Sequence, residues 1–159
     1  MTANVQTERS FTSTRTGPEF PAVGKNFAET VEKIARPKVL VVDDERLLRW
    51  SIVETLNEQG YDARSVGDAA SAIQELDPNW EGADVVLLDV YLPDSDNLGV
   101  LAAIRRLAPE TPIIVMTAYG SPALVERARR LGAFTVLDKP FELGNLAPLV
   151  HCALTTRPS

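Results

Sequence analysis

Five short, nearly continuous apolar runs alternate with amphipathic stretches in the part of the chain that follows Pro37. A run of this kind, such as KVLVVD at 38–43, is typical of a strand that is buried on both faces of a sheet. Between the runs, apolar residues recur at helical spacing, as Leu48, Ile52 and Leu56 do. The expected strands lie at 38–43, 61–66, 83–88, 112–116 and 134–137. This alternation predicts an α/β domain whose parallel sheet is covered by helices on both faces.

Length and composition fit a chain of this class. The 159 residues suffice for one domain of ordinary size, and 45% of them are apolar, which excludes a wholly disordered protein. No apolar run approaches the ~20 residues that span a bilayer, so we expect no membrane insertion. The single cysteine, Cys152, cannot form an internal disulfide, which fits a cytoplasmic location. The net charge of −6 weighs against direct nucleic-acid binding.

The N-terminal part of the chain does not share the alternating pattern. Residues 1–25 are rich in Thr, Ser, Gly and Pro and have no apolar period, which predicts a flexible tail. Within 26–37, two polar residues with N-cap spacing accompany an apolar stripe formed by Phe27, Val31 and Ile34. We therefore expect a short N-terminal helix within 26–37.

Polar side chains stand directly after four of the expected strands. They are Asp43 and Asp44, Asp89, Thr117 and Lys139. The carboxyl ends of parallel strands meet at one edge of a sheet, where such folds bind ligands. Three carboxylates that converge there raise one another's pKa unless a cation lies among them, and Mg²⁺ prefers oxygen ligands of this kind. A lysine and a hydroxyl beside the metal could bind a phosphoryl group, which a carboxylate could accept as the nucleophile.

Each of these residues also has an ordinary structural interpretation. Paired aspartates often cap a turn or a helix, and a single Asp or Thr at a strand end is commonly structural. Their combination at the ends of four strands nevertheless favours a functional site. Elsewhere, we expect Trp50 to be partly buried and Cys152 to lie in the core.

Four segments resemble, in the right order, the receiver domain of bacterial two-component response regulators. They are VLVVDDE (39–45), VVLLDVYLP (85–93), PIIVMTAYGS (112–121) and LGAFTVLDKPF (131–141). The RWSI, MTAYGS and GAF…KPF phrases are most similar to the nitrogen-regulator subgroup. The resemblance covers 38–156 and implies a doubly wound, flavodoxin-like fold. In that fold, a five-stranded parallel sheet of order 2-1-3-4-5 is flanked by five helices.

The resemblance also implies a role for each polar residue at the strand ends. Asp89 would be the phosphoacceptor, and Thr117 and Lys139 would contact the phosphoryl group. The ligands of a Mg²⁺ ion would be Asp44 directly, Asp43 largely through water, Asp89, and the backbone carbonyl of Tyr91.

The sequence departs from the family at one position. Three residues before the lysine, the family usually has a Tyr or Phe whose rotamer reports phosphorylation, and here that residue is Val136. We expect Phe134 to be the nearest aromatic residue on the same face of the strand. The family also implies a cis bond between Lys139 and Pro140, which a proline permits.

These features together predict a phosphorylation switch and not an enzyme with turnover. The 20 residues after Lys139 would complete the last helix and leave no room for an output domain, so we expect a stand-alone receiver. Its phosphoryl donor would be a histidine kinase or a phosphotransfer protein. It would signal by binding an unspecified downstream protein, by passing the phosphoryl group onward, or by forming a phosphorylation-dependent dimer.

Three alternatives are open at this point. The chain could be the receiver fragment of a larger transcription regulator. It could be a phosphatase with an aspartyl nucleophile, although Tyr91 stands where such enzymes usually carry a second Asp. It could be a phosphate-independent interaction module, which the complete acidic set and Lys139 disfavour.

Overall fold

The computed structural model describes residues 35–77, 82–96 and 98–156. With the exception of Ala35, these residues lie in one compact unit, Arg36–Ser159. The expected tail at 1–25 and nearly all of the expected helix within 26–37 lie outside the described residues, so both stay predictions. No helix in the described part of the chain is long and apolar enough to cross a membrane.

The centre of the unit is a parallel sheet of five strands. The strands are β1 (Lys38–Val42), β2 (Asp62–Val66), β3 (Val85–Asp89), β4 (Ile113–Thr117) and β5 (Thr135–Asp138). They lie in the order β2-β1-β3-β4-β5, and every neighbouring pair is parallel. In the register of the central pairs, Val42 lies opposite Leu88, and Asp89 lies opposite Met116. The predicted sheet and its strand order are therefore confirmed.

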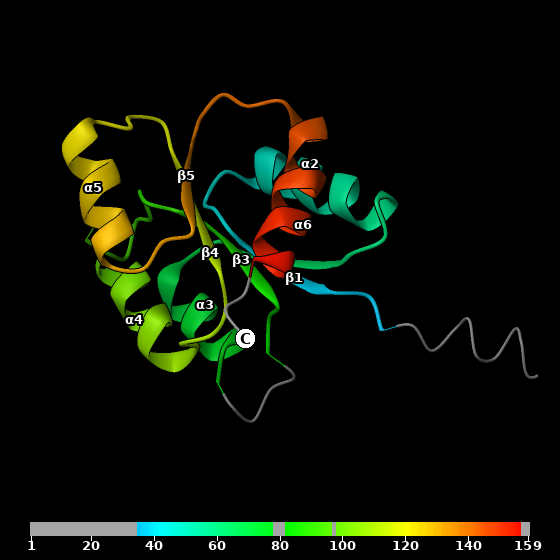
Figure 1. Ribbon diagram of the computed structural model, residues 1–159, viewed down its shortest axis with the longest axis horizontal. Helices are drawn as coiled ribbons and strands as arrows, with labels where there is room; N and C mark the ends of the chain where they lie inside the picture. The colour runs from blue at the N-terminus through cyan, green and yellow to red at the C-terminus, as the bar shows by residue number, and fades with distance from the viewer. Residues whose placement is uncertain (1–34, 78–81, 97, 157–159) are drawn as a thin grey trace, which may run out of the picture. The chain divides into compact units, whose positions relative to one another are not determined.

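Helices cover both faces of this sheet (Figure 1). The α-helices of the described residues are α2 (Arg46–Glu58), α3 (Ala69–Glu75), α4 (Gly99–Leu107), α5 (Pro122–Arg130) and α6 (Leu146–Thr155), and a 3-10 turn, η1 (Leu143–Asn145), precedes α6. Helices α2 and α6 lie on one face, and α3, α4 and α5 lie on the other. Two apolar cores result, because successive residues of each strand point to opposite faces.

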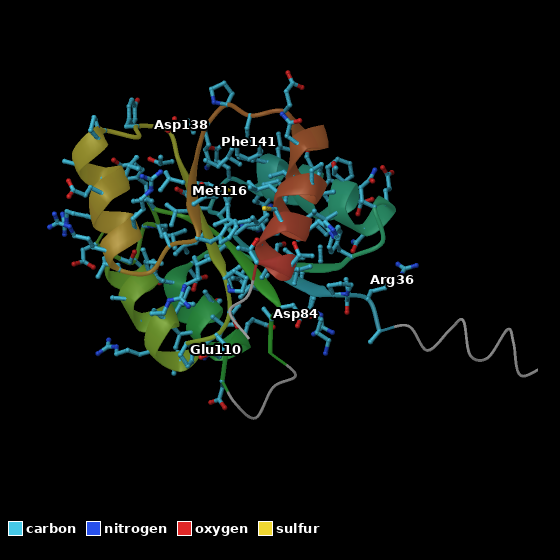
Figure 2. The ribbon with its side chains drawn as sticks, in the orientation of Figure 1. Arg36, Asp84, Glu110, Met116, Asp138 and Phe141 are labelled. Carbon is cyan, nitrogen blue, oxygen red and sulfur yellow. The ribbon has the colours of Figure 1, made fainter. Side chains whose placement is uncertain are left out.

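Each core takes alternate residues of the same strands. In β1, Val39 and Val41 pack toward α2 and α6, whereas Leu40 and Val42 pack toward α3, α4 and α5. The strands are buried on both sides, which explains why they appear in the sequence as continuous apolar runs rather than alternating ones. Met116 lies in the α2 and α6 core (Figure 2).

The ends of several helices follow local rules that the sequence carries. The side chain of Asp68 accepts a hydrogen bond from the Ser71 N–H at the start of α3. At the start of α5, the Ser121 side chain caps the Leu124 N–H in the same way, and Pro122 occupies the first turn. Gly60, with φ of +93°, follows α2 in the left-handed conformation that ends many helices.

Different residues lie at the two edges of the sheet that are formed by the carboxyl-terminal and the amino-terminal ends of the strands. Asp138 and Phe141, at the end of β5 and just after it, lie at the edge that is uppermost in Figure 2. Asp84 and Glu110, which precede β3 and β4, lie toward the opposite edge. The polar residues expected at the site lie at the upper, carboxyl-terminal edge: Asp43, Asp44, Asp89, Thr117 and Lys139.

Two side-chain predictions were wrong. Trp50 is 63% exposed, because it lies on the outer face of α2, whose buried residues are Ile52 and Leu56. Cys152 is exposed, because α6 directs Val150 and Ala153 toward the sheet and turns the residues between them outward.

Candidate functional site

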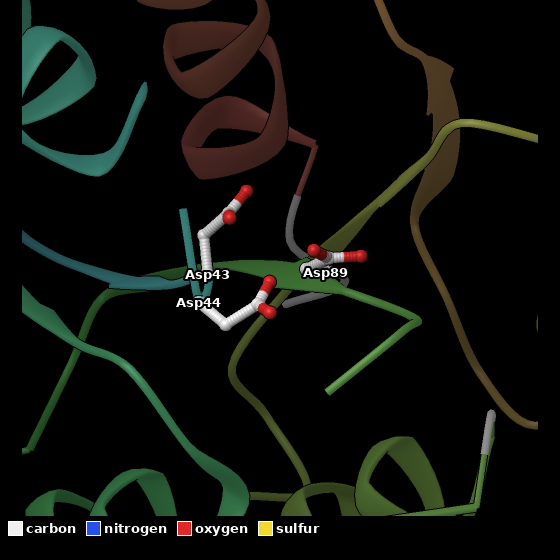
Figure 3. A group of neighbouring side chains, drawn as sticks. All are labelled: Asp43, Asp44 and Asp89. Atoms are coloured by element: carbon white, nitrogen blue, oxygen red, sulfur yellow. The ribbon is translucent and has the colours of Figure 1, made fainter. Parts of the chain in front are cut away.

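The three aspartates at the ends of β1 and β3 lie together at the carboxyl edge of the sheet. One carboxylate oxygen from each of Asp43, Asp44 and Asp89 lies within 4.8 Å of the other two. Figure 3 shows Asp43 and Asp44 leaving the end of β1 beside Asp89, with the Asp44 carboxylate directed toward Asp89. Asp43 and Asp89 are buried, whereas Asp44 is exposed. An ion or ligand would therefore approach from the side of Asp44.

Lys139 places its ammonium between the two buried carboxylates. Its Nζ donates to Asp43 Oδ2 at 2.7 Å and to Asp89 Oδ2 at 3.1 Å, and Glu45 Oε1 is 3.8 Å away. Lys139 comes from the end of β5, and its N–H donates to the Thr117 carbonyl at the end of β4. The peptide bond between Lys139 and Pro140 is cis, as the family resemblance implies. The ammonium offsets part of the repulsion between the carboxylates.

Burial and charge act against each other on the ionisation of these groups. Burial raises the pKa of Asp89, although the Tyr91 N–H and Lys139 oppose this, and the negative charge of Asp43 raises it further. Burial alone would lower the pKa of Lys139, but the hydrogen bond and charge of Asp43, together with Asp89, outweigh burial and raise it. Lys139 alone therefore does not fully offset the cost of ionising Asp89. A second cation beside Asp89 would favour its charged form.

Backbone donors hold the remaining polar atoms of the site. The Tyr91 N–H donates to Asp89 Oδ1 at 2.9 Å, and the Glu45 N–H donates to Asp43 Oδ1 at 2.9 Å. Thr117 is fully buried, and its Oγ1 accepts the Tyr119 N–H at 3.1 Å. Because Oγ1 is the acceptor in that bond, the hydroxyl hydrogen of Thr117 is free to donate to another group.

An aromatic pair spans the two loops beside the site; the spacing in the sequence predicts that both residues lie there, but not that their rings touch. The rings of Tyr91 and Tyr119 meet edge to face, with their centroids 6.4 Å apart. Tyr91 follows the β3 end by two residues, and Tyr119 follows the β4 end by two. Because both tyrosines stand two residues after the ends of neighbouring strands, the sequence places them above the same edge of the sheet.

The prediction that Phe134 shares a face with Val136 was wrong. Val136 packs toward α3, α4 and α5, whereas Phe134 packs in the other core, toward α2 and α6. Phe134 precedes β5, which begins at Thr135, so the strand alternation does not extend back to it. On the face that Val136 occupies, β5 therefore offers a valine and no aromatic ring.

The donor set of this edge fits a hard divalent cation. Three carboxylates supply only oxygen ligands, which is the chemistry that Mg²⁺ prefers, and one of them is exposed. The backbone carbonyl of Tyr91 belongs to the loop that leaves this cluster. The buried ammonium and the free hydroxyl of Thr117 supply the donors that a bound phosphoryl group requires.

Comparisons with known proteins agree with this arrangement. The model of the response regulator receiver domain matches residues 39–151. The transcriptional regulatory protein PdtaR of Mycobacterium tuberculosis (strain ATCC 25618 / H37Rv) is 36% identical over 121 residues, covering 74% of this chain and 57% of PdtaR. The DNA-binding transcriptional regulator NtrC of Proteus hauseri is 34% identical over 117 residues, covering 74% of this chain and 24% of NtrC. The matched region thus spans 57% of the length of PdtaR and 24% of the length of NtrC.

A solved structure agrees with the fold as well. The receiver domain of the Francisella response regulator 1452 superposes with a TM-score of 0.69 at 28% identity, covering 76% of this chain and 98% of that one. Receiver domains are generally signalling modules and not enzymes. The chain therefore belongs to the response regulator receiver domain family and contains a phosphorylation-activated receiver of a two-component system.

Proposed function

We propose that Asp89 accepts a phosphoryl group from the phosphohistidine of a histidine kinase or a phosphotransfer protein. The observation that carries the proposal is the position of Lys139, whose buried ammonium contacts both Asp43 and Asp89. The exposed carboxylate of Asp44 belongs to the same acidic cluster, and Thr117, whose carbonyl accepts the Lys139 N–H, ends the neighbouring strand β4. A lysine, a hydroxyl and an acidic cluster around one buried carboxylate are what phosphoryl transfer to that carboxylate needs.

In the proposed reaction, a carboxylate oxygen of Asp89 attacks phosphorus in line with the P–N bond of the donor. The O–P bond forms, the P–N bond breaks, and its electron pair stays with the donor imidazole. Lys139 and the Thr117 hydroxyl bind the phosphoryl oxygens, while Asp44, Asp43, Asp89 and the Tyr91 carbonyl are the proposed ligands of Mg²⁺. The bound ion would supply positive charge against the developing negative charge of the phosphoryl group.

The proposed output is a protein contact that changes on phosphorylation. The downstream partner is another protein or a second copy of this chain, and neither nucleic acid nor membrane is part of the proposal. The cytoplasm is the proposed location. A second candidate function is the receiver of a longer transcription regulator, because the relatives PdtaR and NtrC are longer than the matched region.

The proposal is tested by weighing the intact protein after incubation with Mg²⁺ and acetyl phosphate. We expect the wild type to gain one phosphoryl group that base removes, as an acyl phosphate requires, and Asp89→Asn to gain none. Asp62→Asn, which changes an aspartate at the start of β2, is the matched control and should gain the group normally. Phosphorylation of Asp89→Asn under the same conditions would show that the acceptor is another residue.

A further inference from the structure

The exposed carboxylate of Asp44 is directed by the backbone that carries it. Among the described residues, the Asp44 side chain forms no hydrogen bond or ion pair, although Figure 3 shows it directed toward Asp89. Its direction therefore depends on the peptide unit between Asp43 and Asp44. Whatever holds the Asp43 carbonyl also sets the position from which the Asp44 carboxylate reaches into the site.

A single side chain from α2 holds that carbonyl. Nη1 of Arg49 donates to the Asp43 backbone oxygen at 2.6 Å, and Arg49 is itself half-buried. The other polar groups of Asp43 are also engaged: its N–H donates to Val66, and its carboxylate accepts from the Glu45 N–H and from Lys139. The peptide unit before Asp44 is thus fixed on one side by the carboxylate contacts of Asp43 and on the other by Arg49.

Gly67 leaves the space in which the Arg49 guanidinium lies. A Cβ on Gly67 would be 2.7 Å from Nη1 of Arg49 and 3.5 Å from its Cζ, which is too close for the guanidinium to keep its place. The φ angle of Gly67 is not in the left-handed region, so its backbone conformation is open to alanine. Glycine at this position is therefore explained by the close approach of Arg49 and not by backbone conformation.

We propose that Arg49 is a positioning residue for the metal site and that Gly67 makes room for it. By fixing the Asp43 carbonyl, Arg49 keeps the Asp44 carboxylate aligned with Asp89, so that both bind one divalent cation. The inference rests on the proposed function, because it concerns the same Mg²⁺ site. It adds α2 and the loop between β2 and α3 to the elements that determine the affinity of that site.

Charge and positioning make opposite predictions for the loss of Arg49. The guanidinium is a positive charge close to the acidic cluster, so its removal alone should favour a bound cation. Loss of the hydrogen bond should instead free the Asp43 carbonyl and misalign Asp44. Weaker Mg²⁺ binding in Arg49→Gln would therefore come from lost positioning, since the electrostatic effect has the other sign.

The test is Mg²⁺ affinity by isothermal titration calorimetry, with thermal unfolding in EDTA as a separate measure of folding. We expect Arg49→Gln and Gly67→Ala each to weaken Mg²⁺ binding by about tenfold, the lower end of what loss of an outer contact costs a metal site. Arg49→Lys, which keeps the charge and one donor, should be intermediate. Arg46→Gln removes a charge from the exposed side of α2, and Gly144→Ala adds a methyl group in open space, so both controls should bind as the wild type does.

The outcomes separate this inference from the function on which it rests. If Arg49→Gln and Gly67→Ala bind Mg²⁺ as tightly as the wild type while Asp44→Ala does not, Arg49 has no positioning role and the metal site stands. If Asp44→Ala itself keeps wild-type affinity, the proposed metal site fails and the role of Arg49 with it. Should Arg49→Gln not fold in EDTA, Gly67→Ala still decides, because it displaces the guanidinium and leaves Arg49 in the chain.

Discussion

At the scale of the residue, Asp89 is a carboxyl group whose ionisation opposes folding. Burial raises its pKa above the ordinary value for an aspartate despite the contact with Lys139. An acid with a raised pKa in the folded state stabilises the fold below its unfolded pKa, and this stability is lost as pH rises through the folded pKa. At neutral pH without metal, we therefore expect Asp89→Asn to raise the melting temperature. The rise should be a few degrees, the effect of about 1 kcal/mol on a domain of this size.

This prediction is checked by melting both proteins in EDTA across pH. The advantage of Asp89→Asn should be largest near neutrality and shrink as the pH falls through the raised pKa of Asp89, where the wild-type carboxyl takes up its proton. Asp94 provides a comparison of opposite sign, because hydrogen bonds from the Ala69 and Ala70 N–H groups lower its pKa. Asp94→Asn should therefore lower the melting temperature at neutral pH and approach the wild type in acid. Equal melting temperatures for Asp89→Asn and wild type at every pH would contradict the conclusion that ionisation of Asp89 destabilises the fold.

At the scale of the element, the sequence was sufficient for the strands but not for every side chain. Continuous apolar runs predicted β1 and β3, because a strand buried on both faces leaves no polar alternation. The polar residues after them could be named for the same reason, since parallel strands end at one edge. The face of Phe134 could not be predicted, because β5 begins at Thr135 and strand alternation holds only within a strand. The hydrogen bond from Arg49 to the Asp43 carbonyl could not be predicted from the sequence either, because the acceptor of a long side chain depends on tertiary packing.

The loops after β3 and β4 are expected to affect the lifetime of the phosphorylated state. An acyl phosphate is lost when water attacks phosphorus in line, and the paired rings of Tyr91 and Tyr119 stand above this edge without a carboxylate or amide to orient that water. We expect the phosphorylated double variant Tyr91→Asn/Tyr119→Glu to lose its phosphoryl group on the order of tenfold faster than the wild type, since a positioned polar group assists attack. The measurement is phosphate release after removal of the donor.

A matched variant separates the rings from their hydroxyl groups. Tyr91→Phe/Tyr119→Phe keeps both rings and should decay at the wild-type rate if the rings exclude water. Tyr119 is 76% exposed, so a docking surface for the output partner is the alternative use of this pair. If the Asn/Glu variant decays no faster than wild type, docking is the better explanation.

At the scale of the whole molecule, the site exists only in the folded chain. The contact between Lys139 and Asp43 joins residues that are 96 positions apart in sequence, and the acidic cluster draws on two strands. The unfolded chain cannot hold these groups together, so an ion that bridges them binds the native state and not the unfolded one. Metal binding and folding are therefore coupled.

This coupling predicts a defined dependence of stability on Mg²⁺ concentration. The free energy of unfolding should rise by about 2.7 kcal/mol at a concentration 100 times the dissociation constant, and by about 1.4 kcal/mol for each further tenfold increase. Urea unfolding at several Mg²⁺ concentrations measures the slope.

Asp44→Ala should lose most of the dependence, and Asp43→Ala should lose less if it acts largely through water. Asp44→Ala should unfold at wild-type or higher urea concentration in EDTA, because removal of its exposed carboxylate relieves repulsion at this edge. Asp43→Ala should unfold at lower urea concentration in EDTA, because it loses the buried contact with Lys139 and the hydrogen bond from the Glu45 N–H. A wild-type stability that does not change with Mg²⁺ would contradict the metal site, since an ion held by Asp44 and Asp89 must stabilise the only state in which they meet.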